Sequence, residues 1–212
     1  MDVFALIAAE RRRLADELDE LSAEEWAHPS LCEGWTCHDV VAHLIVPFTV
    51  GSPAFVVGLL RARLRFDRAN DRFARDAARA RPPADCVALL REHATSRFTP
   101  PMLGPEAPLT DTVTHGGDLL TPLGRSVDVA PEAYDVALRF ASGRRTGFAG
   151  VDLDGLRLEA SDAEVAVGEG HLVVHAPARS LLGAIQGRTA YLDDLGGEGA
   201  DELRRRCLAR AS

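Results

Sequence analysis

Hydrophobic residues recur every three or four positions through about the first two-thirds of the chain, which is the spacing of helices that bury one face. Two capping-box patterns, in which a hydroxyl residue precedes an acidic residue by three positions, are present: Ser22 with Glu25 indicates a short turn before Trp26, and Thr36 with Asp39 indicates the start of a helix. The predicted helices cover residues 3–21, a segment that begins at Cys37, and residues 54–80, 83–96, 109–120 and 131–142. We therefore expect an all-α region in this part of the chain.

The pattern changes near residue 149, where short alternating segments separated by glycine or acidic residues replace the helical spacing. These segments predict a meander of three β-strands, over residues 156–160, 164–167 and 171–174. Helical spacing returns at Ala178 and over residues 200–209. The predicted fold class is therefore α+β, with a helical domain over residues 1–148 and a small C-terminal α+β domain over residues 149–212.

An uncharged stretch from Val40 to Leu60 is long enough to cross a bilayer. Pro47, His43 and the Gly-Ser-Pro break at residues 51–53 argue against a single span, so we expect a buried helix, a hinge and a second helix, and no membrane partner. The N-terminus carries acidic residues where an export signal has basic ones, so no export is expected.

Composition narrows the chemistry further. All 24 basic residues are arginine, against 32 acidic residues, and the formal net charge is −8. The lack of lysine, for which biased composition is a sufficient explanation, excludes Schiff-base chemistry, a lysine general base and a P-loop lysine. The acidic balance argues against a nucleic-acid partner or an anionic lipid surface. The four cysteines form no C-x-x-C pair, so we expect free thiols in a cytoplasmic protein.

Three residues suited to metal binding share one face of the helix predicted over residues 109–120. Asp111, His115 and Asp118 follow one another at intervals of four and three residues. A carboxylate and an imidazole one turn apart can chelate a divalent metal such as zinc, and His43, at the edge of an apolar stripe, is the best candidate for a third ligand. The same pattern also suits a helix-start aspartate, a buried hydrogen-bonded histidine and an exposed aspartate, so both interpretations stay open at this stage.

Two other features accompany this helix. Gly116 and Gly117 each cost about 1 kcal/mol relative to alanine inside a helix, which indicates that a neighbouring helix or a ligand approaches the backbone closely. Six arginines at alternating steps of four and three, from Arg61 to Arg79, form a stripe interleaved with aspartates. A solvated, salt-bridged face is the expectation for this stripe, and an anion-binding groove is the alternative.

Taken together, three segments resemble the mycothiol-dependent maleylpyruvate isomerase family, whose members have a DinB-like metal-binding four-helix bundle. The segments are Leu31-Cys-Glu-Gly-Trp35-Thr-Cys-His-Asp39-Val-Val-Ala-His43-Leu, Asp111-Thr-Val-Thr-His115-Gly-Gly-Asp118, and the C-terminal run from Ala178 to Arg188. The resemblance covers nearly the full chain. It implies that the N-terminal helical domain is a DinB-like four-helix bundle followed by the small α+β domain.

The resemblance also implies roles for individual residues. His43, Asp111 and His115 match the metal ligands, although the second ligand is often glutamate and Asp111 is one methylene shorter. Asp118 matches the last acidic position of the motif, where it would orient His115 or pair with an arginine. Arg188 matches a position that faces the site, where its guanidinium would bind a substrate carboxylate or contact the cofactor.

The function implied is metal-assisted thiol chemistry, with zinc as the expected metal and mycothiol or a similar low-molecular-weight thiol as the cofactor. The expected reaction is cis-trans isomerisation of a small electrophilic substrate that carries a carboxylate. A thiol S-transferase with the same ligands is one alternative, and a non-catalytic metal-binding module is another. We expect a monomer or a homodimer.

Overall fold

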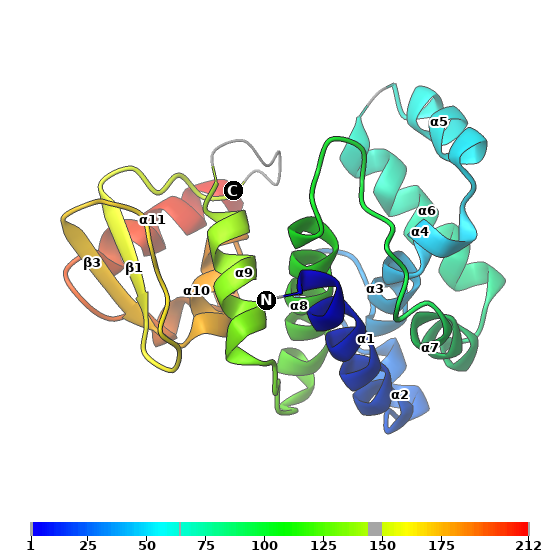
Figure 1. The fold of residues 1–212 in the computed structure, drawn as a ribbon, viewed down its shortest axis with the longest axis horizontal. Helices are drawn as coiled ribbons and strands as arrows, with labels where there is room; N and C mark the ends of the chain where they lie inside the picture. Colours follow the sequence, from blue (N-terminus) through cyan, green and yellow to red (C-terminus); the bar gives the residue numbers. More distant parts are fainter. Residues whose placement is uncertain (1, 64, 144–149, 212) are drawn as a thin grey trace. The chain divides into compact units, whose positions relative to one another are not determined.

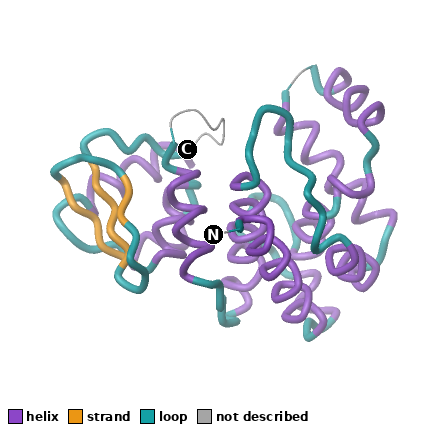
Figure 2. Tube along the Cα trace, viewed as in Figure 1, coloured by secondary structure: helices purple, strands orange, loops and turns teal. Residues whose placement is uncertain are grey.

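The computed structural model describes residues 2–63, 65–143 and 150–211, and this part of the chain is mostly helical with one small sheet (Figure 1; Figure 2). The predicted fold class, a helical N-terminal region with a small C-terminal α+β region, is confirmed. Two compact units divide the chain: unit 1 is Met1–Phe98 with Asp118–Val127, and unit 2 is Thr99–Gly117 with Asp128–Ser212. The predicted boundary between residues 148 and 149 lies outside the described residues and stays a prediction.

Two helices of unit 1, α2 and α3, start at the capping boxes marked in the sequence. Both predicted capping boxes form, because the Ser22 and Thr36 side chains accept bonds from the backbone N–H groups of Glu25 and Asp39, whose carboxylates accept in return. The elements are α1 (Val3–Asp19), α2 (Ala23–Ala27), α3 (Cys37–Leu44), α4 (Val46–Thr49), α5 (Ser52–Arg61), α6 (Phe66–Ala80), α7 (Pro83–Glu92), the last turn of α8 (Glu106–Leu120) and the 3-10 helix η1 (Thr121–Leu123).

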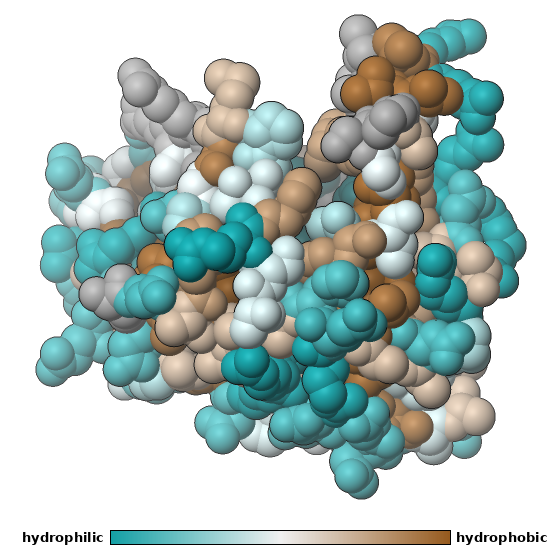
Figure 3. Space-filling view, turned by 45° about the vertical axis from the view of Figure 1, so that its right-hand side comes forward, coloured by the Kyte–Doolittle hydropathy of each residue, from teal (hydrophilic) through white to brown (hydrophobic). Residues whose placement is uncertain are grey.

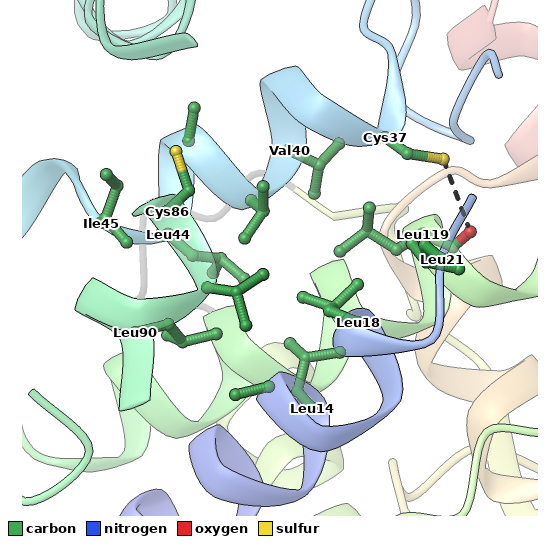
Figure 4. Close-up of a cluster of buried hydrophobic side chains, with 14 of the residues drawn as sticks. Leu14, Leu18, Leu21, Cys37, Val40, Leu44, Ile45, Cys86, Leu90 and Leu119 are labelled. Carbon is green, nitrogen blue, oxygen red and sulfur yellow. Dashed lines mark hydrogen bonds between the residues drawn. The ribbon is translucent and has the colours of Figure 1, made fainter. Parts of the chain in front are cut away.

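The core of unit 1 is formed by the apolar faces of α1, α3 and α7 together with the last turn of α8 (Figure 4). Leu14 and Leu18 of α1, Val40 of α3 and Leu90 of α7 are each at most 1% exposed. The thiol of Cys37 lies 3.8 Å from the carbonyl oxygen of Leu119, which joins the start of α3 to the end of α8. Burying such side chains contributes about 1.5–3 kcal/mol each, so this core fixes where α3 lies.

The helix predicted over residues 54–80 is wrong as a single element. The structure ends α5 at Arg61 and begins α6 at Phe66, and Arg63 between them has a positive φ of 55° that no helix interior contains. The break lets α5 fold back, so that the rings of Phe55 and Phe73 stack with centroids 5.6 Å apart. In a continuous helix these two residues would be about 27 Å apart.

This break also divides the predicted arginine stripe. Arg61 lies at the end of α5, and the regular spacing continues only on α6. There, Arg72 and Arg79 both pair with Asp76, and Arg75 pairs with Asp71. These pairs agree with the expected salt-bridged face.

The uncharged stretch from Val40 to Leu60 has the expected form of a buried helix, a hinge and a second helix: α3, then α4, then α5. Within the described part of the chain, no helix combines the length and the apolar character that crossing a bilayer requires. Apolar side chains do reach the surface, as the brown areas of Figure 3 show. Val56 and Leu60 of α5 are among the exposed large hydrophobic residues.

Unit 2 contains the rest of the regular structure. Its elements are most of α8, α9 (Pro131–Ala141), β1 (Leu156–Ala160), β2 (Ala166–Val167), β3 (Leu172–Ala176), α10 (Ala178–Ile185), the 3-10 helix η2 (Thr189–Asp194) and α11 (Ala200–Ala211). Helix α10 packs against α9, α11 and β1, so its residues are almost all buried. The sheet and these helices therefore form one layered core within the unit.

The predicted meander is wrong in its topology. The sheet order is β2-β1-β3, with β2 antiparallel and β3 parallel to β1, so β1 is the central strand. The short strand β2 brings the chain back to the start of β1. There the segment between β2 and β3 passes over the start of β1, and Gly170 lies so close to it that a Cβ on this residue would collide with the backbone of Gly155. A glycine at this crossing lets β3 begin on the opposite edge of β1.

Candidate functional site

Helix α8 places Asp111 and His115 side by side in unit 2. The helix begins at Glu106, three residues before the predicted start, because Pro108 is tolerated in the first turn, where backbone N–H groups have no helical partner. Nε2 of His115 lies 3.5 Å from Oδ1 of Asp111, and their side chains are 14% and 27% exposed. The predicted one-turn pairing of a carboxylate and an imidazole is thus present, at a partly solvent-accessible position.

His43 lies in unit 1, in the last turn of α3, and is 9% exposed. Its ring lies beside the indole of Trp35, with centroids 5.4 Å apart and planes at 45°. Of the three predicted metal ligands, His43 thus belongs to unit 1, and Asp111 and His115 belong to unit 2. Their assignment as ligands stays a prediction.

Asp118 is 1% exposed and joins α8 to the loop before α3, within unit 1. Its Oδ2 accepts a hydrogen bond from the thiol of Cys32 at 3.1 Å, and its carbonyl oxygen accepts one from the N–H of Leu31 at 3.1 Å. Asp118 therefore holds this loop through both its side chain and its backbone. Its predicted action on His115 or on an arginine stays a prediction.

Arg188 follows α10 in unit 2, at a position fixed by the end of that helix. Gly187 has a φ of 81°, and the N–H groups of Gly187 and Arg188 donate to the carbonyl oxygens of Ala184 and Gly183, both at 2.9 Å. This is a Schellman motif, which favours glycine at the left-handed position. Arg188 is half-buried, and its Nη1 lies 3.4 Å from the carbonyl oxygen of Gln186.

The close approach expected at the paired glycines of α8 is present at Gly117. A Cβ on this residue would lie 3.1 Å from the hydroxyl oxygen of Tyr191, which belongs to η2 of the same unit. Tyr191 is 4% exposed, and its ring also packs against Gly183 of α10. A neighbouring side chain thus accounts for this glycine.

The four cysteines are free thiols, as expected. Burial raises the pKa of Cys37, Cys86 and Cys207 to about 11, so these thiols stay protonated near neutral pH and are poor nucleophiles. Cys32 is half-buried and donates to Asp118. Three of the four thiols are therefore structural, and a thiol reaction at this protein needs a sulfur from elsewhere or Cys32.

Sequence reasoning did not assign a role to Cys32, Trp35 or Tyr191. Cys32 and Asp118 are 86 residues apart, and Trp35 bonds to Asp71 across 36 residues, so no local spacing marks either pair. The one local signal is that Cys32 and Trp35 lie inside the motif that also contains His43.

Comparisons with known proteins agree with the fold described above. A crystal structure of the mycothiol-dependent maleylpyruvate isomerase is similar in fold, with a TM-score of 0.55 at 16% identity over 88% of each chain. The structure of a histidine-to-alanine mutant of the enzyme of that name gives a TM-score of 0.57 at 15% identity, over 93% of this chain and 92% of the other. No curated protein matches the sequence.

A family profile provides the sequence evidence that these distant structural matches lack. The profile of the mycothiol maleylpyruvate isomerase N-terminal domain matches residues 7–137, which is more than half of the chain and includes His43, Asp111, His115 and Asp118. The resemblance found in the sequence motifs is therefore confirmed. This chain belongs to the mycothiol-dependent maleylpyruvate isomerase family.

Proposed function

We propose that the chain is a metal-dependent enzyme that uses a mycothiol-type thiol to isomerise a small electrophilic carboxylate about a double bond. The observation that carries this proposal is the Asp111–His115 pair on α8, which lies inside the part of the chain matched by the family profile. The name of that family supplies the cofactor and the type of reaction. The free cysteines and the acidic net charge suit a cytoplasmic enzyme of small molecules.

The proposed metal ligands are His43, Asp111 and His115, with zinc as the metal. Two ligand atoms that each lie about 2.1 Å from a tetrahedral zinc ion are about 3.4 Å apart. The 3.5 Å between Nε2 of His115 and Oδ1 of Asp111 is close to this value, which supports an aspartate ligand at a position where the family often has glutamate. Two imidazoles and a carboxylate form a donor set that suits catalytic zinc, which leaves a position for another group.

Residues of the chain itself would hold the loop beside α8 and bind the substrate. When bound, the metal would lower the pKa of the cofactor thiol, so that a thiolate is available near neutral pH for reversible addition to the substrate. Asp118 would keep the loop of Cys32 against α8, and Arg188 would bind a carboxylate through its planar pair of donors. Because the chain has no lysine, arginine is the residue available for such an anchor.

Replacing Arg188 with glutamine should raise KM for the carboxylate substrate by about 10- to 100-fold, because a charge-assisted hydrogen bond contributes about 1.5–3 kcal/mol. The measurement is steady-state kinetics with zinc-loaded protein. Arg179→Gln is the matched control, since Arg179 is an exposed arginine of α10 in the same unit. An unchanged KM in Arg188→Gln would remove Arg188 from the substrate-binding residues.

The direct test incubates zinc-loaded protein with mycothiol and maleylpyruvate and follows the double-bond geometry by proton NMR. Isomerised product that requires both zinc and thiol supports the proposal. A stable thiol adduct without isomerisation would instead identify an S-transferase. Zinc binding with neither product nor adduct, over a panel of unsaturated carboxylates, would identify a non-catalytic metal-binding module.

A further inference from the structure

The loop that leads into α3 holds the backbone of Trp35 at three points. The Trp35 N–H donates to the carbonyl oxygen of Cys32 at 3.0 Å. Its own carbonyl oxygen accepts from the N–H and the hydroxyl of Ser30, both at 2.9 Å. Trp35 immediately precedes the capping residue of α3, so this loop carries the indole to its position beside His43.

The indole is also held from α6, at its polar end. Nε1 of Trp35 donates to Oδ1 of Asp71 at 2.8 Å, and Nε of Arg75 donates to the same oxygen at 2.9 Å. Nη2 of Arg75 then donates to the carbonyl oxygen of Gly34 at 2.9 Å. Asp71 and Arg75 thus fix the ring and the adjacent loop together, and all these residues lie in unit 1.

The acceptor in this network is a carboxylate. Burial by itself would raise the pKa of Asp71, but hydrogen bonds from Trp35 and Arg75 and the charge of Arg75 lower the pKa below its usual value. Asp71 is therefore ionised at neutral pH. A hydrogen bond to an ionised acceptor is stronger than one between neutral groups. The bond to Asp71 can therefore restrict the rotation of the Trp35 indole.

We propose that Asp71 is a positioning residue for the metal centre: by holding the indole of Trp35, it fixes the orientation of the His43 imidazole. The proposal rests on the proposed function, in which His43 is a metal ligand. A histidine ring must be aimed at the metal through two side-chain torsions, and a fixed aromatic neighbour 5.4 Å away restricts both. Groups that hydrogen-bond directly to a metal ligand typically change metal affinity by about 10- to 100-fold when they are removed, and we expect the lower end of this range for Asp71, which acts on His43 through Trp35.

The experiment compares the zinc affinity of wild type, Asp71→Ala and Asp71→Asn by competition with a chromophoric chelator. Asp71→Ala should bind zinc about 10-fold more weakly, because the indole loses its acceptor. Asp71→Asn keeps an oxygen that can accept from the indole and should restore most of the affinity, although its ion pair with Arg75 is lost. Asp76→Ala is the matched control, since it removes arginine pairs from the same helix at a residue that does not contact Trp35.

A second measurement needs no metal. In the carbon–proton NMR spectrum of the metal-free protein, the ring protons of His43 should shift in Asp71→Ala, because the ring current of Trp35 changes, and should stay near wild type in Asp71→Asn. The inference is overturned if Asp71→Ala retains both the wild-type affinity and the wild-type His43 signals, or if Asp71→Asn loses as much affinity as Asp71→Ala. Failure of the wild-type protein to bind zinc would instead contradict the proposed function, and the two failures are therefore distinguishable.

Discussion

Replacing His115 with alanine is expected to abolish tight zinc binding and, with it, catalysis. The substitution removes one of two donor atoms that lie 3.5 Å apart on α8, so Asp111 loses the partner with which it can chelate a metal ion. Removing an orienting neighbour already costs about 10- to 100-fold in affinity, so losing a ligand should cost at least about 100-fold. Metal content after dialysis, measured by mass spectrometry, and chelator competition give the result.

The matched control is His175→Ala. This histidine belongs to β3 of the same unit, its side chain is 55% exposed, and its removal should leave the zinc content unchanged. Circular dichroism shows whether each variant keeps its helices. A His115→Ala protein that still carries one zinc per chain would refute the assignment of α8 as the metal-binding helix.

Replacing Gly170 with alanine is expected to destabilise unit 2 by about 3 kcal/mol, near the upper end for an added methyl group in a packed site. The new Cβ would collide with the backbone of Gly155, which cannot rotate away as a side chain could. Two backbone hydrogen bonds hold the segment around Gly170 against the start of β1, on either side of the collision. The N–H of Gly170 donates to the carbonyl oxygen of Leu156 at 3.1 Å, and the N–H of Leu172 donates to that of Gly155 at 3.2 Å. Urea unfolding followed by circular dichroism measures the loss.

Gly196→Ala is the control for this variant. A Cβ on Gly196 would have its nearest neighbour at 3.6 Å, an ordinary contact, and its backbone bonds to His175 would remain. Its free energy of unfolding should stay close to that of wild type. If Gly170→Ala were as stable as Gly196→Ala, the crossing described for the β2–β3 connection would be incorrect.

The features that sequence reasoning predicted well are those decided by neighbours in the chain. Ser22 and Thr36 form their capping boxes with residues three positions away, and α3 begins at Cys37 as predicted. Asp111 and His115 share a helix face because a four-residue step is about one helical turn. In each case the interacting groups lie within one turn of each other, so local spacing is sufficient evidence.

The two largest errors in the predicted fold concern contacts between distant residues. The helical periodicity from residue 54 to residue 80 does not reveal the break after Arg61. The break goes with a contact between two helices, the stacking of Phe55 on Phe73, which forms only when α5 folds back. The alternating pattern of the strand segments, with glycines between them, is typical of a meander. In the structure, the close contact between Gly170 and the backbone of Gly155 instead lets β3 pair parallel to β1. Hydrophobic spacing describes which face of an element is buried but not which element covers it.

The sequence by itself determined the helical and α+β regions, the face shared by Asp111 and His115, and the family, because these depend on local spacing and on motifs read along the chain. The tertiary structure decided the fold-back of α5 and the order of the strands. It also decided which residues contact the predicted site residues. The thiol of Cys32 donates to Asp118, and the indole of Trp35 lies beside His43 and donates to Asp71. Such pairs are set by the packing of separate elements, whose geometry is not recorded in the spacing of residues along the chain.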